Sequence, residues 1–181
     1  MPDGVTGTGI GAAVKRVEDQ RFLTGRGNYT DDINRPGQTY AYVLRSPHAH
    51  ATIKSIDTAA ASAASGVVAV FTGADMEVGG LPCGWLIHNE DGSPMHEPPH
   101  PPLAVGKVRH VGDQVAVVIA ESLAEAKNAA ELIKVDYGVL PAVIDMKTAE
   151  AGGTLVHDDI GTNKCYDWGI GDNDAVDAAL A

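Results

Sequence analysis

Residues 114–138 read QVAVVIAESLAEAKNAAELIKVDYG, and this stretch decides the fold class. Its first part, Val115 to Ala120, is continuously apolar, which is typical of a strand that is covered on both faces. A helix is expected to begin at Ser122, because Ser122 and Glu125 have the spacing of a capping box. Residues 133–138 then predict a further strand.

The predicted helix carries one apolar stripe, formed at helical spacing by Leu123, Ala126, Ala130 and Ile133. A helix with such a stripe packs against another element of a core. The stretch therefore indicates a domain in which a helix covers neighbouring strands.

The chain before this stretch predicts four more elements. Asp57 or Thr58 can cap the alanine-rich helix among them, which is expected to stop at Gly66. In chain order the elements are strands over residues 39–46 and 51–57, a helix over residues 58–65 and a strand over residues 67–72. Strands and helices in this order predict an α+β fold.

Two segments lack any apolar period. Residues 77–102 are rich in proline and glycine and read as a long loop, and residues 146–181 read as an acidic, glycine-rich tail or linker that ends in the opening of a helix. Both contain large apolar side chains, which are Leu81, Trp85, Leu86, Ile87, Tyr166, Trp168 and Ile170. Because exposed apolar groups favour contacts, we expect these segments of the isolated chain to stay mobile or to drive self-association.

The composition excludes several classes of partner. The chain has 181 residues, with 24 acidic against 13 basic side chains and a net charge of −11. Such a surface repels phosphate groups, so neither nucleic acid nor an anionic membrane is an expected partner. The N-terminus lacks the pattern of a secretory signal, and no apolar run approaches the length of a membrane span. We expect a cytoplasmic protein, in which Cys83 and Cys165 could form at most one disulfide.

His48 and His50 lie two residues apart at the head of a predicted strand. Side chains at this spacing project from the same side of an extended chain, as a metal or acid/base pair would require. A metal site needs a third ligand, which the neighbouring sequence does not identify. The favoured interpretation is a pair of structural histidines that bond to local backbone.

Cys83, His88, His96 and His100 form a second candidate cluster, within the loop of residues 77–102. Their spacing matches no paired-ligand zinc motif, so a solvated loop is favoured over a metal site. A free-standing metal-binding protein or metalloenzyme that uses this loop remains the alternative function.

Three further patterns carry no expected chemistry. Gly7 to Gly11 read GTGIG but lack the preceding strand that a phosphate-binding loop requires. The acid pairs Asp31–Asp32 and Asp158–Asp159 are adjacent in sequence and more often serve turns. No catalytic, cofactor-binding or metal-binding residue is predicted.

Several segments taken together resemble the large subunit of molybdenum hydroxylases, the family of aldehyde oxidase, xanthine dehydrogenase and carbon monoxide dehydrogenase. They are KRVEDQRFLTGRGNYTDDINRPGQTYAYVLRSPHAHATIKSIDT at residues 15–58, GVVAVFTGADM at 66–76, and residues 101–145 from PPLAVGKVRHVGDQ to PAVID. The resemblance implies the family's α/β hammerhead domain, with a mixed sheet and a few packed helices. It also implies that the segment holding His48 and His50 is a turn between strands and not a metal site.

The resemblance implies a parent enzyme that hydroxylates an aldehyde, an N-heterocycle or a similar substrate, or oxidises carbon monoxide, with water as the oxygen source. Such an enzyme uses molybdopterin, in bacteria often the cytosine dinucleotide form, and passes electrons to [2Fe–2S] clusters and FAD in partner subunits or domains. The family's catalytic glutamate lies in later domains, so this chain alone is expected to be inactive. The substrate is not determined by this resemblance.

The domain organisation follows from these observations. We expect a flexible arm over residues 1–14, the hammerhead domain over residues 15–145, and a tail over residues 146–181 that leads toward a missing molybdopterin-binding domain. The implied partners are the molybdopterin-binding domains of the large subunit, the iron–sulfur subunit and the flavin subunit.

Overall fold

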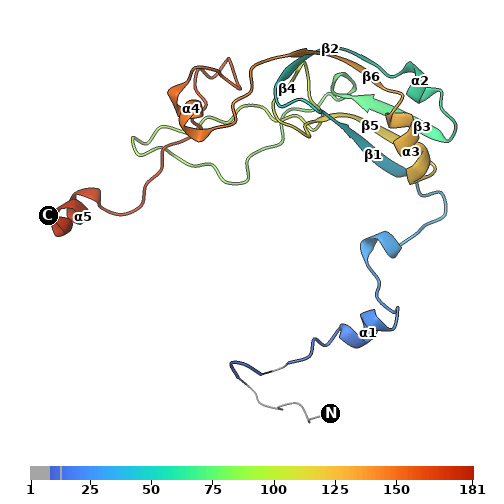
Figure 1. Cartoon of the computed structure of the whole chain (residues 1–181), viewed down its shortest axis with the longest axis horizontal. Coiled ribbons are helices and arrows are strands. Elements are labelled where there is room, and N and C mark those ends of the chain that lie inside the picture. The colour runs from blue at the N-terminus through green and yellow to red at the C-terminus, as the bar shows by residue number, and fades with distance from the viewer. Residues whose placement is uncertain (1–8, 13) are drawn as a thin grey trace. The chain divides into compact units, whose positions relative to one another are not determined.

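Strand β5, Gln114–Ala120, is the central strand of a three-stranded sheet in the computed structural model, which describes residues 9–12 and 14–181 (Figure 1). It pairs antiparallel with β1, Tyr40–Arg45, on one side and with β3, Val67–Thr72, on the other. Its apolar sequence fits this central position, but the expected cover on both faces is only partial: Ala116, Val118 and Ala120 on one face are buried, whereas Val117 and Ile119 on the other are half-buried.

A second three-stranded sheet has β2, Ala51–Asp57, at its centre. Strands β4, Lys107–Val108, and β6, Lys134–Val139, flank it, and both pair with it antiparallel. The α+β class is confirmed. The expected mixed sheet differs in detail, because the strands form two sheets and every recorded pairing between them is antiparallel.

Helix α3, Leu123–Ala130, packs against the first sheet. Its alanines face the even-numbered residues of β5, and the short helix α2, Ala59–Ser62, completes the cluster. Small side chains on both elements let the helix backbone come close to the strand. The buried members of this core are Ala61, Ala116, Val118, Ala120, Ala126, Ala129, Ala130 and Ile133.

Of the four residues predicted to form the apolar stripe of this helix, three are buried and one is exposed. Leu123 is 43% exposed, whereas Ala126, Ala130 and Ile133 are buried. The buried stripe includes Ala129 in place of Leu123.

The two sheets share their apolar contacts. Val115, on the other face of β5, packs with Ala51 and Val108 of the second sheet. Ile56 and Val135 are partly buried against both clusters, so they join the two cores. The sheets therefore bury their inner faces together.

The caps of the helices are formed by local side chains. Ser122 Oγ accepts a hydrogen bond of 3.2 Å from the Glu125 N–H and donates one of 2.7 Å to the Glu125 carboxylate. Asp57 Oδ1 accepts from the Ala59 N–H at 3.0 Å, which supports the predicted cap of α2. Helix α2 ends at Ser62, earlier than the predicted stop at Gly66, which has a φ of +74°, the left-handed conformation in which glycine is least strained.

The described residues before Thr39 form a compact unit of their own, and residues Thr39–Ala181 form another. The first unit contains helix α1, Asp19–Leu23, and the 3-10 turn η1, Thr30–Asp32. Phe22 and Tyr29 stack within it, with ring centroids 5.3 Å apart. Most of the predicted flexible arm, residues 1–8 and 13, lies outside the described residues.

The remaining elements follow the sheets. The 3-10 turn η2 is Gly73–Asp75, helix α4 is Met146–Ala151 and helix α5 is Asn173–Leu180. In α4, Asp145 Oδ2 accepts from the Thr148 N–H at 2.8 Å and Gly152 ends the helix with a φ of +75°. None of the helices in the described part of the chain is long and apolar enough to span a membrane.

Replacing Ser122 by Ala tests the cap of α3. The change removes the acceptor of the Glu125 N–H, and we expect the free energy of unfolding to fall by about 1 kcal/mol. Urea denaturation measures it, and Ser65→Ala, at an exposed turn position, is the matched control. An unchanged urea midpoint for Ser122→Ala would show that α3 does not depend on this cap.

Candidate functional site

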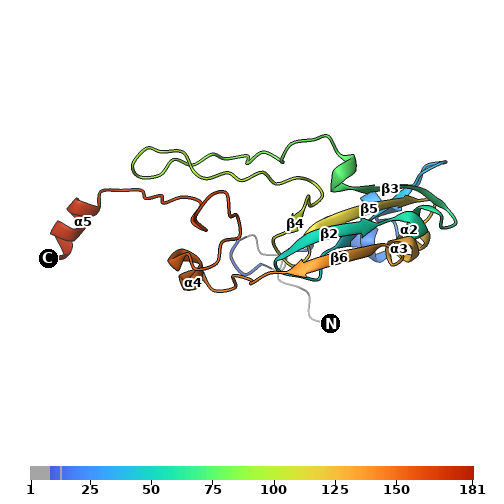
Figure 2. The same cartoon turned by 90° about the horizontal axis from the view of Figure 1, so that it is seen from above.

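The loop of residues 77–102 forms a long irregular hairpin. Its two legs are joined near the base by a 2.7 Å hydrogen bond from Leu81 N–H to His100 O, and near the tip by a 2.8 Å bond from Asn89 N–H to Ser93 O. Figure 2 shows the two legs running side by side between η2 and β4. The loop was predicted, but its internal pairing was not.

The tip of this loop is hydrogen-bonded to the tail of the chain. Glu90 N–H donates to Asp167 O at 3.0 Å, and His96 N–H donates to Cys165 O at 2.8 Å. In return, Asp167 N–H donates to the side-chain oxygen of Asn89 at 2.7 Å. Two segments that are about 70 residues apart in sequence therefore lie together, and we call their contact the loop–tail junction.

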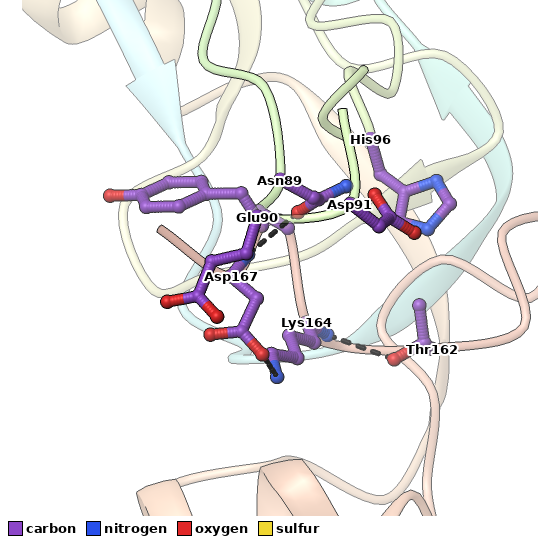
Figure 3. A pocket seen from close by; sticks show the side chains of 9 residues that line it. Asn89, Glu90, Asp91, His96, Thr162, Lys164 and Asp167 are labelled. Carbon is purple, nitrogen blue, oxygen red and sulfur yellow. Dashed lines mark hydrogen bonds and ion pairs between the residues drawn. The ribbon is translucent and has the colours of Figure 1, made fainter. Parts of the chain in front are cut away.

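A cavity of about 320 Å³ lies at the loop–tail junction (Figure 3). Three of its charged side chains have partners, since Lys164 Nζ contacts Asp167 Oδ2 at 2.6 Å and Asp91 Oδ1 accepts from Ser93 Oγ at 2.6 Å. The hydrogen bond to Asp167 raises the pKa of Lys164, and the bonds from Ser93 lower the pKa of Asp91. The carboxylates of Asp91 and Asp167 are therefore engaged in local contacts at the junction.

The first part of the tail is organised by Asn163. Its Nδ2 donates to Thr154 O at 2.7 Å and to Ala149 O at 3.2 Å, while its Oδ1 accepts from the Val156 N–H at 2.9 Å. One amide side chain thus satisfies three backbone groups of a segment that has little apolar burial.

A hollow of about 490 Å³ beside the loop–tail junction is lined almost entirely by apolar groups. We call it the tryptophan surface; its residues are Trp85, Leu86, Ile87, His88 and Trp168. Trp85 is 81% exposed and Trp168 is 57% exposed. Large exposed apolar groups that cluster in this way mark contact surfaces.

His48 and His50 are held by separate structural contacts. His48 packs edge-on against the Tyr137 ring at a centroid distance of 4.9 Å. His50 is buried, and its Nδ1 lies 2.8 Å from Pro141 O, which can only accept a hydrogen bond. Within the described residues, no group of three or more His, Cys, Asp or Glu side chains could hold a metal ion.

Cys83, His88, His96 and His100 are all exposed, and both cysteines of the chain are free. The structure does not bring these loop side chains into a common ligand group within its described residues. The described residues of the loop therefore provide no set of ligands that would support the metal-binding alternative.

One acid of each pair makes a structural contact. Asp32 Oδ2 accepts from the Tyr29 N–H at 2.8 Å within the turn η1, as predicted for turn carboxylates. Asp158 Oδ2 contacts Lys107 Nζ at 2.5 Å. In the GTGIG segment, Gly7 and Thr8 lie outside the described residues.

The family profile described as aldehyde oxidase and xanthine dehydrogenase, a/b hammerhead domain, matches residues 24–141. The chain is 38% identical to the carbon monoxide dehydrogenase large chain of Afipia carboxidovorans, over 96% of this chain and 22% of that one. It is 41% identical to the nicotine 6-hydroxylase large subunit of Paenarthrobacter nicotinovorans, over 84% of this chain and 18% of that one. The chain therefore spans only about a fifth of the length of these relatives.

The structure is similar to that of Cu,Mo-CO dehydrogenase in its carbon monoxide reduced state, with a TM-score of 0.70 and 36% identity. The match covers 94% of this chain and 22% of the other. The chain thus belongs to the aldehyde oxidase and xanthine dehydrogenase family and contains its a/b hammerhead domain. The resemblance and the α/β hammerhead fold expected from the sequence are confirmed.

Sequence reasoning missed the two asparagines that organise the loop and the tail. Asn89 stands before Glu-Asp-Gly, a turn signal that predicts a tight reversal. Asn163 follows Gly161 and Thr162, which signal only a loop. Neither pattern indicates which distant backbone group the asparagine side chain binds.

Replacing Asn89 by Ala tests the loop–tail junction. The change removes the acceptor of the Asp167 N–H, so we expect faster hydrogen exchange at the Asp167 and Glu90 amides, by several-fold. The matched control is Asn128→Ala on the exposed side of α3. Equal exchange rates in Asn89→Ala and the unchanged chain would show that Asn89 does not hold the junction.

The pH dependence of stability tests the surroundings of His157. Burial lowers the pKa of His157 from its usual 6.5, and the charges of Arg109 and Lys107 lower it further, against Asp159 and Asp158. As pH falls below 6.5 the unfolded chain takes up this proton before the folded chain, so stability is lost.

His157→Gln should therefore reduce the loss of unfolding free energy between about pH 7.5 and about pH 5.5. Urea denaturation at a series of pH values measures this loss, with exposed His88→Gln as the matched control. An identical pH profile for His157→Gln and the unchanged chain would contradict the lowered pKa.

Proposed function

We propose that this chain acts as the hammerhead domain of the large subunit of a molybdenum hydroxylase, where it is a structural and docking domain. The observation that carries the proposal is the family match over residues 24–141, on a structure similar to that of Cu,Mo-CO dehydrogenase. A domain of this kind contributes position and contact surface, and not reacting groups.

The parent reaction is proposed from the family alone. It hydroxylates an aldehyde, an N-heterocycle or a similar substrate, or oxidises carbon monoxide, with oxygen taken from water. Molybdopterin, proposed in its cytosine dinucleotide form, supplies the redox chemistry, and electrons pass to [2Fe–2S] clusters and FAD in partner subunits or domains. No residue of this chain is proposed to hold that cofactor.

The tryptophan surface is the proposed contact region of this domain. Trp85 and Trp168 expose large apolar rings, and rings of this kind dominate the energetics of protein interfaces. The remaining domains of the large subunit, the iron–sulfur subunit and the flavin subunit are the proposed partners. A cytoplasmic location fits such an assembly.

The domain boundaries follow the same proposal. Residues 15–145 form the hammerhead domain, preceded by an arm over residues 1–14. Residues 146–181 lead toward the molybdopterin-binding domain, and their hydrogen bonds to the loop of residues 77–102 support a defined exit direction for the chain.

The isolated chain is expected to carry no stoichiometric molybdenum and to have no hydroxylase activity, because the family's catalytic glutamate and cofactor-contacting loops are expected in later domains. Elemental analysis and a dye-linked assay with aldehyde, N-heterocycle and carbon monoxide substrates measure this. A complete molybdenum hydroxylase purified from the same host is the control. Stoichiometric molybdenum together with turnover in this chain alone would overturn the proposal.

Sedimentation of the same sample tests the docking role. An uncovered tryptophan surface should cause concentration-dependent self-association, which Trp85→Ser combined with Trp168→Ser removes. Leu180→Ser, at an exposed apolar position away from this surface, is the matched control. A clean monomer at all concentrations would show that the tryptophan surface is not sufficiently apolar to drive contacts.

A further inference from the structure

The face of the first sheet that lies opposite α3 carries a block of apolar side chains. Its members alternate along β1, β3 and β5 with the residues that pack toward α3, so they project from the other side of the sheet. The strand registers align them in two rows across the three strands, each row centred on β5. Ala41, Ile119 and Ala69 form one row, and Val43, Val117 and Phe71 form the other; together we call them the outer face.

The outer face is not covered by either apolar core of the described chain. None of its six members belongs to these two clusters or packs against them. Val117 and Ile119 are only half-buried, although strands flank them on both sides, and Phe71 is 39% exposed. The water-facing side of an antiparallel sheet usually carries polar residues. An apolar block at this place therefore indicates a contact surface.

The three strands that form this face are almost free of charge in a strongly acidic chain. Only one of their side chains is charged, Arg45 at the end of β1, and its Nη1 donates to Gly112 O at 2.9 Å. The chain as a whole has 24 acidic against 13 basic side chains. An apolar patch on so acidic a protein favours a partner whose own apolar surface is bordered by basic side chains.

The width of the outer face suits a single helix. Neighbouring strands lie about 4.8 Å apart, so the first and third strands of a sheet are separated by about 10 Å. An α-helix with its side chains has a diameter of about 10–12 Å. One helix can therefore cover three strands, and α3 does so on the opposite face, where it packs over residues of β1, β3 and β5.

The same dimensions argue against a second copy of this chain as the occupant. Two rows of three residues measure about 14 Å in each direction, or roughly 200 Å² per partner. A stable interface between separate proteins buries about 800 Å² per partner. A second copy would also bring a further net charge of −11 toward the first.

We propose that the outer face is a docking site for an amphipathic α-helix from outside this chain, with an apolar stripe and basic side chains beside it. A helix at this place would complete a helix–sheet–helix arrangement, in which both faces of the first sheet are covered. The proposal rests on the registers and burial of the first sheet. It is therefore independent of the tryptophan surface and of the reaction of the parent enzyme.

The test is a titration of the 181-residue chain, followed by NMR at the methyl resonances of Val117 and Ile119. The probe is a helical peptide of about five turns, with a stripe of leucine and alanine and lysines beside it. One control peptide has glutamates in place of the lysines, and another has the same composition in scrambled order. We expect a saturable shift with the lysine peptide, binding weaker by at least about threefold with the glutamate peptide, and no saturable shift with the scrambled one. No shift at these methyls, or equal binding of any control peptide, overturns the proposal.

Variants assign the response to the outer face. Val117→Thr keeps the branched shape and the strand preference, but it places a hydroxyl where the helix would bury it without a partner. We expect peptide binding to weaken by at least about fivefold. Val139→Thr, at an exposed position of β6 in the second sheet, should leave binding unchanged. Unchanged binding by Val117→Thr overturns the proposal, and if that variant does not fold, Phe71→Thr on the edge strand decides with the same expected direction.

A soluble nitroxide tests whether the face is open in the chain alone. It should broaden the methyl resonances of Val117 and Ile119 more than those of Val118, which is fully buried on the other side of β5. Broadening equal to that of Val118 would show that the chain itself covers the outer face, and the proposal would fail.

Sedimentation separates the helix from a second copy. The chain with Trp85→Ser and Trp168→Ser should be a monomer, because the outer face alone is too small for a stable dimer. Self-association that persists in this variant and is removed by adding Val117→Thr would assign the face to a second copy and overturn the proposal. Failure of the helix site leaves the scaffold proposal unaffected, since molybdenum content tests that proposal.

Discussion

The close packing of helix α3 on strand β5 is the interaction on which the rest of the fold depends. Ala126, Ala129 and Ala130 of the helix meet the small residues of β5, and these contacts bury almost the whole inner face of α3. Alanine has no side-chain entropy to lose, so burial of this face is opposed by little ordering cost. Because β5 also pairs with β1 and β3, the helix positions all three strands of the first sheet.

The loop of residues 77–102 and the tail are held by a different kind of interaction. The sheets are joined by apolar burial, as at Ile56 and Val135, whereas the loop–tail junction rests on backbone hydrogen bonds and on the amide of Asn89. Polar contacts near water contribute less net stability than apolar burial of similar extent. The periphery of the domain can therefore present its apolar groups, including Trp85 and Trp168, to other parts of an assembly.

The charged side chains are unevenly distributed over the domain. The chain is strongly acidic, but basic side chains gather where β2 and β4 meet the tail, at Lys107 and Arg109. Asp158 of the tail neutralises Lys107, which ties the tail to β4 across 51 positions of sequence.

The sequence by itself determined the elements of the core: residues 67–72 form a strand as predicted, and Ser122 caps the helix that follows β5. These features are local, since apolar period and capping depend on residues a few positions apart. The tertiary structure alone decided that the strands divide into two antiparallel sheets, that Leu123 faces solvent, and that His50 is buried with Nδ1 beside Pro141 O. It also decided that Asn89 binds the backbone of Asp167, a contact across 78 positions. Pairings of this kind depend on which distant segments meet once the core has formed, and no local pattern contains that information.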